Sequence, residues 1–231
     1  MSAIKPFLLY AFCFLALTTT ALAQVTKNYD VSTITGISIG LHAEVEITQS
    51  NQQSITVTTS QRNFDRIKTR VKGGNWEIKT KDGANIGKDV KIKISLKNLE
   101  EINLAGSAKI VSTNTFKNLE DLEINISGSG SIDLSAEGEE VDCNIAGSGS
   151  LYLKGSAEDM DVSIAGSGNI DAYDFKVEKC DVSSAGSGNV KVHVDDQLNA
   201  SMVGSGDVYY KGSPKVQSSI IGSGDLEKAG S

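Results

Sequence analysis

The sequence predicts an all-β protein, folded as a right-handed parallel β-helix, and three observations lead to this fold class. Gly-Ser-Gly recurs six times after a degenerate Gly-Ser-Ala, which gives about seven coils of 18 to 22 residues. Apolar and polar residues alternate on both sides of each copy, as in strands with one buried face. A unit this short cannot bury a core alone, so the units must stack on one another.

Residues 1–23 have the features of a secretory signal peptide. Lys5 precedes an apolar run over residues 7–17, and the small residues Ala21-Leu22-Ala23 follow it. The run is too short to span a bilayer. We therefore expect cleavage between Ala23 and Gln24, a periplasmic or extracellular mature protein, and no integral membrane segment after cleavage.

Residues 24–100 lack the repeat but keep the strand pattern. The runs AEVEITQ, SITVTTS, WEIKT and VKIKISL alternate apolar and polar residues, and turn-prone segments separate them. QRNFDRIKTRV predicts one helical turn, and Trp76 is expected to pack inside the first coils. We interpret this segment as irregular first coils or an N-terminal cap, continuous with the repeats of residues 101–231 in one domain.

In the repeats, the residues six, four and two positions before the first glycine are almost all apolar, and those between them are polar. A second short strand follows the glycines. Stacked coils lie about 4.8 Å apart, so equivalent inward residues form continuous apolar rows. Parallel crossovers are right-handed almost without exception, which sets the expected hand.

The repeated glycines are interpreted as structural turn residues. A phosphate-binding loop requires a following Lys-Ser or Lys-Thr and a helix, whereas each bend here leads into another strand. Glycine permits the positive φ that a tight bend requires. The expected turn residues are Gly128, Gly130, Gly147, Gly149, Gly166, Gly168, Gly186, Gly188, Gly204, Gly206, Gly222 and Gly224.

Charge divides the mature chain into two parts. Residues 24–100 carry 12 Lys or Arg against 8 Asp or Glu, and residues 101–231 carry 9 against 21. The acidic balance disfavours nucleic acid as a partner. Opposite charge at the two ends favours self-association through the ends of the helix.

A column of acidic residues lies five positions before the glycines. It has two possible interpretations: the carboxylates repel one another and are solvated, or they are weak calcium ligands. The candidate metal ligands are Glu123, Asp142, Asp161 and Asp181.

Catalysis is not expected, because coils of 18 to 20 residues leave little room for the long loops of polysaccharide-cleaving β-helices. His42 and His193 have no recognisable nucleophile partner in the sequence. Cys143 and Cys180 fall on inward positions two coils apart, too far for a disulfide, and are expected to be buried free thiols. No cofactor is expected, apart from the calcium alternative.

The runs VEITQ, QSITVTTS, FDRIKTRVKGGNWEIKT and VKIKISLKNLEEINLAGSAKI, followed by the reiterated Gly-Ser-Gly, resemble the secreted bacterial family called putative auto-transporter adhesin, head GIN domain. The resemblance covers residues 30–226. It implies a right-handed β-helix of the pectin-lyase-like class, found largely in Bacteroidetes-type bacteria. An autotransporter would carry a C-terminal membrane barrel, whereas Ser231 follows the last repeat closely.

These observations favour a secreted or periplasmic, non-enzymatic β-solenoid that acts as an interaction or adhesion module for an unknown protein or glycan ligand. Two alternatives stay open. One is a carbohydrate-binding protein or a polysaccharide lyase or hydrolase, and the other is a structural or assembly scaffold.

Overall fold

The protein, described by a computed structural model, is a β-solenoid of about seven turns, with 72% of its residues in strands and 2% in helix. The structure describes residues 24–81, 84, 86–87 and 89–229. The expected signal peptide lies outside these residues. No helix among the described residues is long and apolar enough to cross a membrane.

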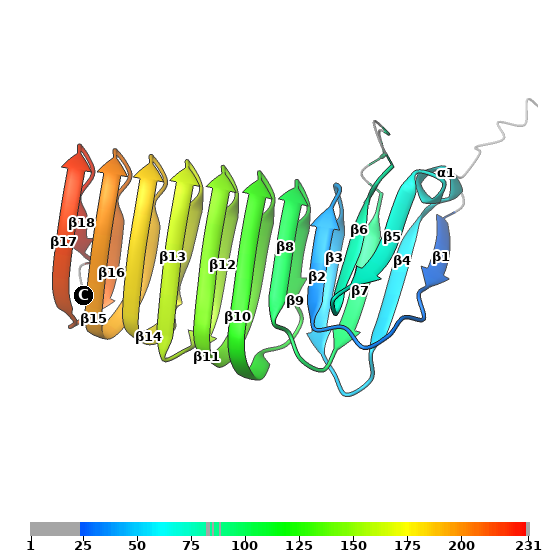
Figure 1. Cartoon of the computed structure of the whole chain (residues 1–231), viewed down its shortest axis with the longest axis horizontal. Helices are drawn as coiled ribbons and strands as arrows, with labels where there is room; N and C mark the ends of the chain where they lie inside the picture. The colour runs from blue at the N-terminus through cyan, green and yellow to red at the C-terminus, as the bar shows by residue number, and fades with distance from the viewer. Residues whose placement is uncertain (1–23, 82–83, 85, 88, 230–231) are drawn as a thin grey trace, which may run out of the picture.

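Each turn has two long sides, which we call face A and face B, joined by the Gly-Ser-Gly corner. Face A carries the strands that precede each corner, and face B carries the strands that follow it. In Figure 1 the chain runs up face A on the near side, crosses the corner at the top, and returns on the far side while it advances to the left. This path is a right-handed coil, as the sequence predicted.

Face A is built from ten strands, of which β10, β11, β14 and β15 contribute their C-terminal parts. From the N-terminal end of the solenoid to its C-terminal end, they are β5 (Ile67–Lys72), β6 (Asn75–Thr80), β2 (Gly36–Gly40), β8 (Glu101–Gly106), β10 (Phe116–Gly128), β11 (Ser131–Gly147), β13 (Asp159–Gly166), β14 (Asn169–Gly186), β15 (Val190–Gly204) and β17 (Lys215–Gly222).

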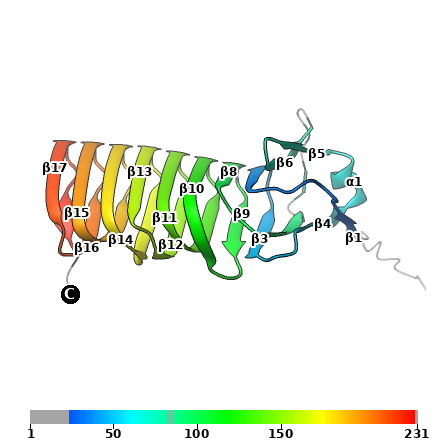
Figure 2. The same ribbon diagram turned by 60° about the horizontal axis from the view of Figure 1, so that its bottom comes forward.

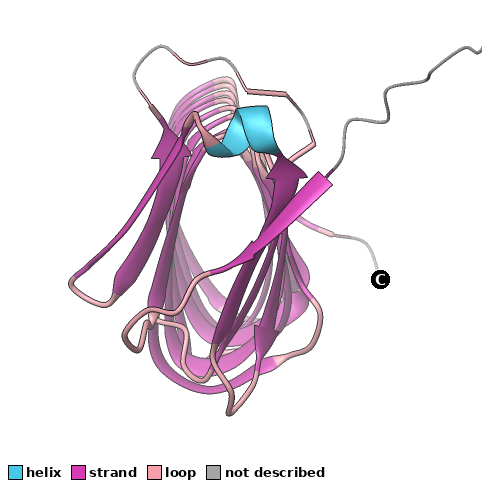
Figure 3. Cartoon of the chain, turned by 90° about the vertical axis from the view of Figure 1, so that its right-hand side faces the viewer, coloured by secondary structure: helices cyan, strands magenta, loops and turns pink. Residues whose placement is uncertain are grey.

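Face B follows a similar order, with the N-terminal parts of β11, β14 and β15 placed among its own strands. The other strands are β1 (Gln24–Asn28), β4 (Ser54–Ser60), β7 (Lys91–Leu96), β3 (Glu44–Gln49), β9 (Lys109–Ser112), β12 (Ser150–Ser156), β16 (Val208–Gly212) and β18 (Leu226–Lys228). Opposite the corner, β11, β14 and β15 pass from face B to face A as continuous strands. Figure 3, viewed along the solenoid, shows this wide bend below the narrow corner.

The first coils do not stack in chain order. Strand β2 pairs in parallel with both β6 and β8, so the coil of β2 and β3 lies between the coil of β6 and β7 and the first repeat. Strand β4 is antiparallel to β1 and β7, and β5 is antiparallel to β6. Figure 2 shows these irregular strands beside the regular repeats. The predicted helical turn is α1 (Gln61–Phe64), capped by the Ser60 side chain.

A single apolar core runs the length of the solenoid. Trp76 is fully buried near the N-terminal end, and Ile124, Cys143, Val162 and Val182 form one inward row that is at most 3% exposed. The parallel register places these row members directly on one another. Burial of each aliphatic side chain contributes about 1.5 to 3 kcal/mol, so stacking turns short strands into one stable domain.

The two glycines of each corner have different roles. The first has a positive φ, from 126° at Gly147 to 144° at Gly106, which a side chain would strain. The second is required for close packing instead: a Cβ on Gly168 would lie 2.4 Å from Ile145 Cγ2. The expectation of positive φ is therefore confirmed for the first glycine only. The serines between them are exposed and form a stacked row along the corner, as at Ser148, where the backbone N–H donates to Gly128 O over 2.9 Å.

Candidate functional site

The outer surface of face A carries polar side chains in straight rows. The register pairs Glu101 with Glu123, and each later acid with the one on the next coil, through Asp142 and Asp161 to Asp181. We call these five residues the acidic row; Asn199 and Gln217 continue its line. The structure thus places all four candidate metal ligands in one column, as the sequence predicted.

Further acids lie beside the acidic row, where the chain turns into face A. On three consecutive coils the sequence reads EDLE, EEVD and EDMD, which places three carboxylates on each coil. We call these nine residues the acidic patch: Glu120, Asp121, Glu123, Glu139, Glu140, Asp142, Glu158, Asp159 and Asp161.

The acidic patch has little internal compensation. Among the described residues, the one cation within 4.0 Å of it is Lys179, whose Nζ lies 3.2 Å from Asp159 Oδ1. The Asp142 carboxylate, together with partial desolvation, raises the pKa of Glu140. Desolvation and then the carboxylates of Asp142 and Asp181 raise the pKa of Asp161. Both shifts have the direction expected when like charges are stacked and unpaired.

A second row, the middle row, runs two residues closer to the corner and changes along the solenoid. Its first part is an amide ladder, in which Asn125 Nδ2 donates to Asn103 Oδ1 over 3.0 Å and Asn144 Nδ2 donates to Asn125 Oδ1 over 3.2 Å. The same Asn125 Nδ2 also lies 2.9 Å from Glu123 Oε1. Asn103 Nδ2 donates in the same way to Glu101 Oε1 over 2.7 Å, so the amides satisfy part of the hydrogen-bonding capacity of the acids on the first two coils.

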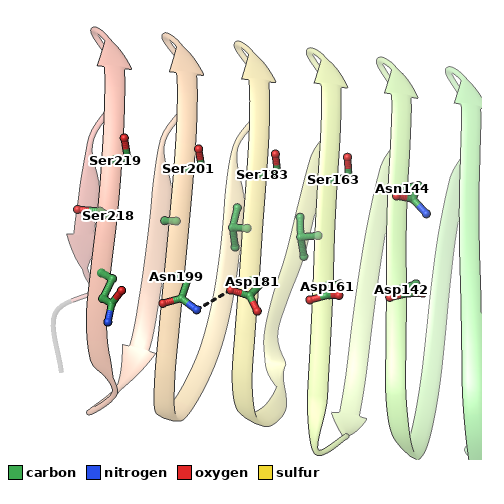
Figure 4. Close-up of a pocket in the computed structure, with 14 residues that line it drawn as sticks. Asp142, Asn144, Asp161, Ser163, Asp181, Ser183, Asn199, Ser201, Ser218 and Ser219 are labelled. Atoms are coloured by element: carbon green, nitrogen blue, oxygen red, sulfur yellow. Dashed lines mark hydrogen bonds between the residues drawn. The ribbon is translucent and has the colours of Figure 1, made fainter.

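From Ser163 onward, serines replace the asparagines of the middle row. A groove of about 730 Å³ opens between these serines and the acidic row, and its floor is formed at the intervening inward residues such as Val162 and Val182. Figure 4 shows Asp142, Asp161 and Asp181 along one side and the serines along the other. We call it the serine groove. It begins beside the acidic patch, because Asp142 and Asp161 belong to both.

A second groove of about 510 Å³ lies on the other side of the acidic patch. Its lining includes Glu120, Asp121, Glu140 and Asp142, together with Asn98 from the preceding coil. We call it the bend groove. Asp142 lines both grooves, so the acidic patch lies between the serine groove and the bend groove.

The tightest carboxylate cluster consists of Glu140, Asp142 and Asp161, whose potential ligand atoms all lie within 4.8 Å of one another. Asp142 and Asp161 were candidate ligands from the sequence. Glu123 and Asp181 lie elsewhere in the row, and Asp181 Oδ1 accepts a 2.6 Å hydrogen bond from Asn199 Nδ2. The sequence analysis did not single out Glu140. Each of the three coils has a pair of acids two and three residues before its member of the acidic row, and this repeated pair could have indicated it.

Face B has a different polar surface. Lys154 and Lys191 pair with Asp133 and Asp171 at 3.2 and 3.3 Å, so charges on neighbouring coils compensate one another. Next to the corner, the side-chain oxygens of residues 169, 189 and 207 each accept the backbone N–H of the equivalent residue on the next coil, at 3.0 to 3.1 Å. This row links coils together.

The cysteines and histidines do not form a reactive group in the described structure. Cys143 and Cys180 are free and buried, as predicted, and burial raises the pKa of the Cys180 thiol to about 12. His42 lies at the corner of the β2–β3 coil, whereas His193 Nε2 on face B is 3.9 Å from Asp195 Oδ1. Tyr152 and Tyr209 share a row on face B, separated by Asp171 and Lys191.

Comparison with known proteins gives a consistent result over most of the chain. Residues 33–214 match the family model described as putative auto-transporter adhesin, head GIN domain. A crystal structure of a putative lipid binding protein from Parabacteroides distasonis is 28% identical, with a TM-score of 0.74 over 90% of this chain and 97% of the other.

Two adhesin structures are also similar. A putative adhesin from Parabacteroides distasonis is 27% identical with a TM-score of 0.68, and one from Bacteroides fragilis is 22% identical with a TM-score of 0.81. Both alignments cover 90% of this chain and 97% of the other. No curated protein sequence matches the chain.

Proposed function

The chain belongs to the putative auto-transporter adhesin, head GIN domain family, and from this membership we propose that it is a non-enzymatic interaction module that acts outside the cytoplasm. The acidic side of face A is the binding surface, and a partner with regularly spaced positive charges is the ligand class. The observation that carries this proposal is the acidic patch, which gathers nine carboxylates on three coils with one neighbouring lysine among the described residues.

The rigidity of the solenoid supports this assignment. Equivalent residues repeat from coil to coil at the spacing of parallel strands, so a ligand meets a preformed row of carboxylates. Repulsion from Asp142 is the main cause of the raised pKa of Glu140, and it adds to desolvation in raising the pKa of Asp161. A cationic partner relieves this repulsion, and that relief contributes to binding. The serine groove supplies hydroxyl groups beside the carboxylates for further hydrogen bonds.

The test uses a lysine-rich oligopeptide as the probe and calorimetry as the readout. We expect binding that weakens as salt rises, because exposed charges are screened over about 10 Å at 0.1 M ionic strength. The double variant Asp142→Asn/Asp161→Asn should bind several-fold more weakly. A matched double variant on face B, Asp133→Asn/Asp174→Asn, removes the same charge and should bind like the wild type. Equal losses in both variants would show a general charge effect and reject the assigned surface.

A divalent cation is the second candidate ligand, favoured by the close cluster of Glu140, Asp142 and Asp161. Carboxylate oxygens are the ligands that calcium prefers. Calcium titration should release or absorb heat and raise the unfolding temperature of the wild type, and Asp142→Asn should lose both effects. If calcium titration of the wild type gives no heat and its unfolding temperature does not change, calcium is rejected as a ligand. The peptide result is unaffected by that outcome.

A further inference from the structure

The C-terminal end of the solenoid exposes apolar residues at positions that are buried on the preceding coil. Val216 and Ile220 occupy inward positions of β17 but are 37% and 38% exposed. Their partners on the preceding coil, Leu198 and Met202, are 0% and 3% exposed. The apolar row is thus continuous up to the last described coil and uncovered on its outer side.

The same end presents strand edges with unused hydrogen-bonding groups. On face B, inward residues donate their backbone N–H to the following coil: Ile170 to Asn189 O at 3.0 Å, and Val190 to Asp207 O at 2.9 Å. On face A the outward Glu123 donates its N–H back to Glu100 O of the preceding coil over 2.8 Å, so the inward residues of these parallel strands point their N–H groups forward. In β17 these inward residues are Val216, Ser218 and Ile220, and in β18 Leu226 is equivalent. Among the described residues no further coil lies there to receive these groups. Unpaired edges of this kind favour pairing with another chain.

The N-terminal end is closed differently. Strands β5 and β1 are antiparallel additions at the edges, and α1 lies beside the corner at this end in Figure 3. Strand β5 carries Lys68, Arg70 and Lys72 at alternate positions, a pattern that protects edges from pairing. Strand β17 has no charged residue from Val216 to Gly222. The two ends therefore differ in protection: among the described strands, β5 carries the charges of a protected edge and β17 does not.

We propose that this end binds the same end of a second copy of the chain and forms a closed, tail-to-tail dimer. A partner has to pair with β17 and β18 at the same time and cover the apolar residues between them. A second copy presents two such edges around the same apolar row, whereas a single extended peptide pairs with one edge. A twofold axis makes the contacting strands antiparallel, which is compatible with hydrogen bonding between edges.

The dimer closes because the protected N-terminal ends point away from the contact. The charge-driven head-to-tail contact expected from the sequence would instead build an open fibre. A closed dimer carries two acidic patches on one rigid particle. This arrangement would strengthen attachment to a ligand that reaches both patches.

Light scattering coupled to size exclusion tests the proposal on the chain from Gln24 to Ser231, which contains every described strand. We expect twice the monomer mass. Ile220→Lys places a charge on the exposed apolar row and should give a monomer. The matched variant Ile221→Lys changes the neighbouring residue, which points outward from face A and is 67% exposed, and should stay dimeric.

A second variant separates lost pairing from lost folding. Ser218→Pro removes an N–H that faces the open edge and keeps the bonds from β17 to β15, so we expect a monomer whose unfolding temperature matches that of Ile220→Lys. A wild-type monomer at every concentration and salt level would overturn the proposal. So would masses that grow without limit, or dimer loss in Ile221→Lys with a persistent dimer in Ile220→Lys.

Discussion

The N-terminal region, residues 24–100, and the repeat region, residues 101–229, share one core but fix their strands in different ways. Four polar residues are buried in the described part of the chain: Thr59, Asn63 and Asn75 lie in the N-terminal region, and Ser184 lies in the repeats. Hydrogen bonds from buried side chains help to hold the irregular strands. In the repeats, similar coils hold one another through backbone contacts, so the two glycine positions of each corner must stay free of side chains.

The two regions also use charge differently. In the N-terminal region Arg70 forms a bidentate pair with Glu77, with contacts of 2.6 and 2.9 Å, and Lys93 Nζ lies 2.8 Å from Glu46 Oε2. The acidic patch of the repeats lacks such pairing apart from Lys179 among the described residues. Charges of the N-terminal region therefore support the fold, whereas those of the acidic patch remain available for a partner.

The largest expected difference concerns glycine. Gly168→Ala places a Cβ 2.4 Å from Ile145 Cγ2 and 3.0 Å from Gly149 O, and we expect a loss of about 3 kcal/mol in the free energy of unfolding. Gly73→Ala, in the turn between β5 and β6, meets no atom within 4 Å and strains only its φ of 58°, at a cost of about 1 kcal/mol. Urea unfolding measures both, and equal losses would contradict the distinct role of the corner.

Buried polar residues give the next comparison. Asn63 Nδ2 donates to Thr59 Oγ1 at 2.9 Å and to Asp89 Oδ1 at 2.6 Å, and Gly87 N donates to Asn63 Oδ1 at 3.2 Å. Asn63→Ala should cost about 2 kcal/mol, because buried partners lose their bonds. Ser184→Ala in the repeats should change the free energy of unfolding by less. Thermal unfolding of the two variants checks this order, which a costlier Ser184→Ala would reverse.

The pH dependence should separate the two regions by sign. Raised pKa values of Glu140 and Asp161 mean that the folded repeats bind protons more tightly than the unfolded chain, so stability increases as the pH falls from neutral through those values. The hydrogen bond from Arg70 lowers the pKa of Glu77, and its stabilisation is lost as the pH falls through that lower value. As the pH is lowered from neutral, the unfolding temperature should first rise and then fall. A steady decrease from neutral pH would contradict the role of the patch.

Single substitutions that replace a carboxylate by an uncharged amide should have the smallest effects on the free energy of unfolding. Asp161→Asn relieves repulsion and should raise stability near neutral pH by a few tenths of a kcal/mol, as is common for exposed charges. Glu77→Gln should lower it by a similar amount, because Arg70 loses a charged partner. Urea unfolding at neutral pH measures the two changes. Changes of the same sign would show that neither region depends on local charge in the proposed way.

Much of the repeat region could be predicted from residue order alone. A period of 18 to 22 residues and strict alternation define which side chains point inward, and therefore that Glu123, Asp142, Asp161 and Asp181 share a column. The repeat works as its own template, since each coil pairs with a near copy of itself. The N-terminal order was not predictable in this way, because β2 pairs with β6 and β8 through contacts that no local pattern encodes.

The sequence by itself determined the solenoid, its corners, its buried cysteines and the acidic row, because all of these follow from periodicity along the chain. Only the tertiary structure decided where Glu140 meets Asp142 and Asp161, where serines replace the amide ladder and open a groove, and which end lacks protection. These features depend on contacts between coils and on side-chain length. A one-dimensional pattern specifies the rows, but space between the rows exists only after the coils have stacked.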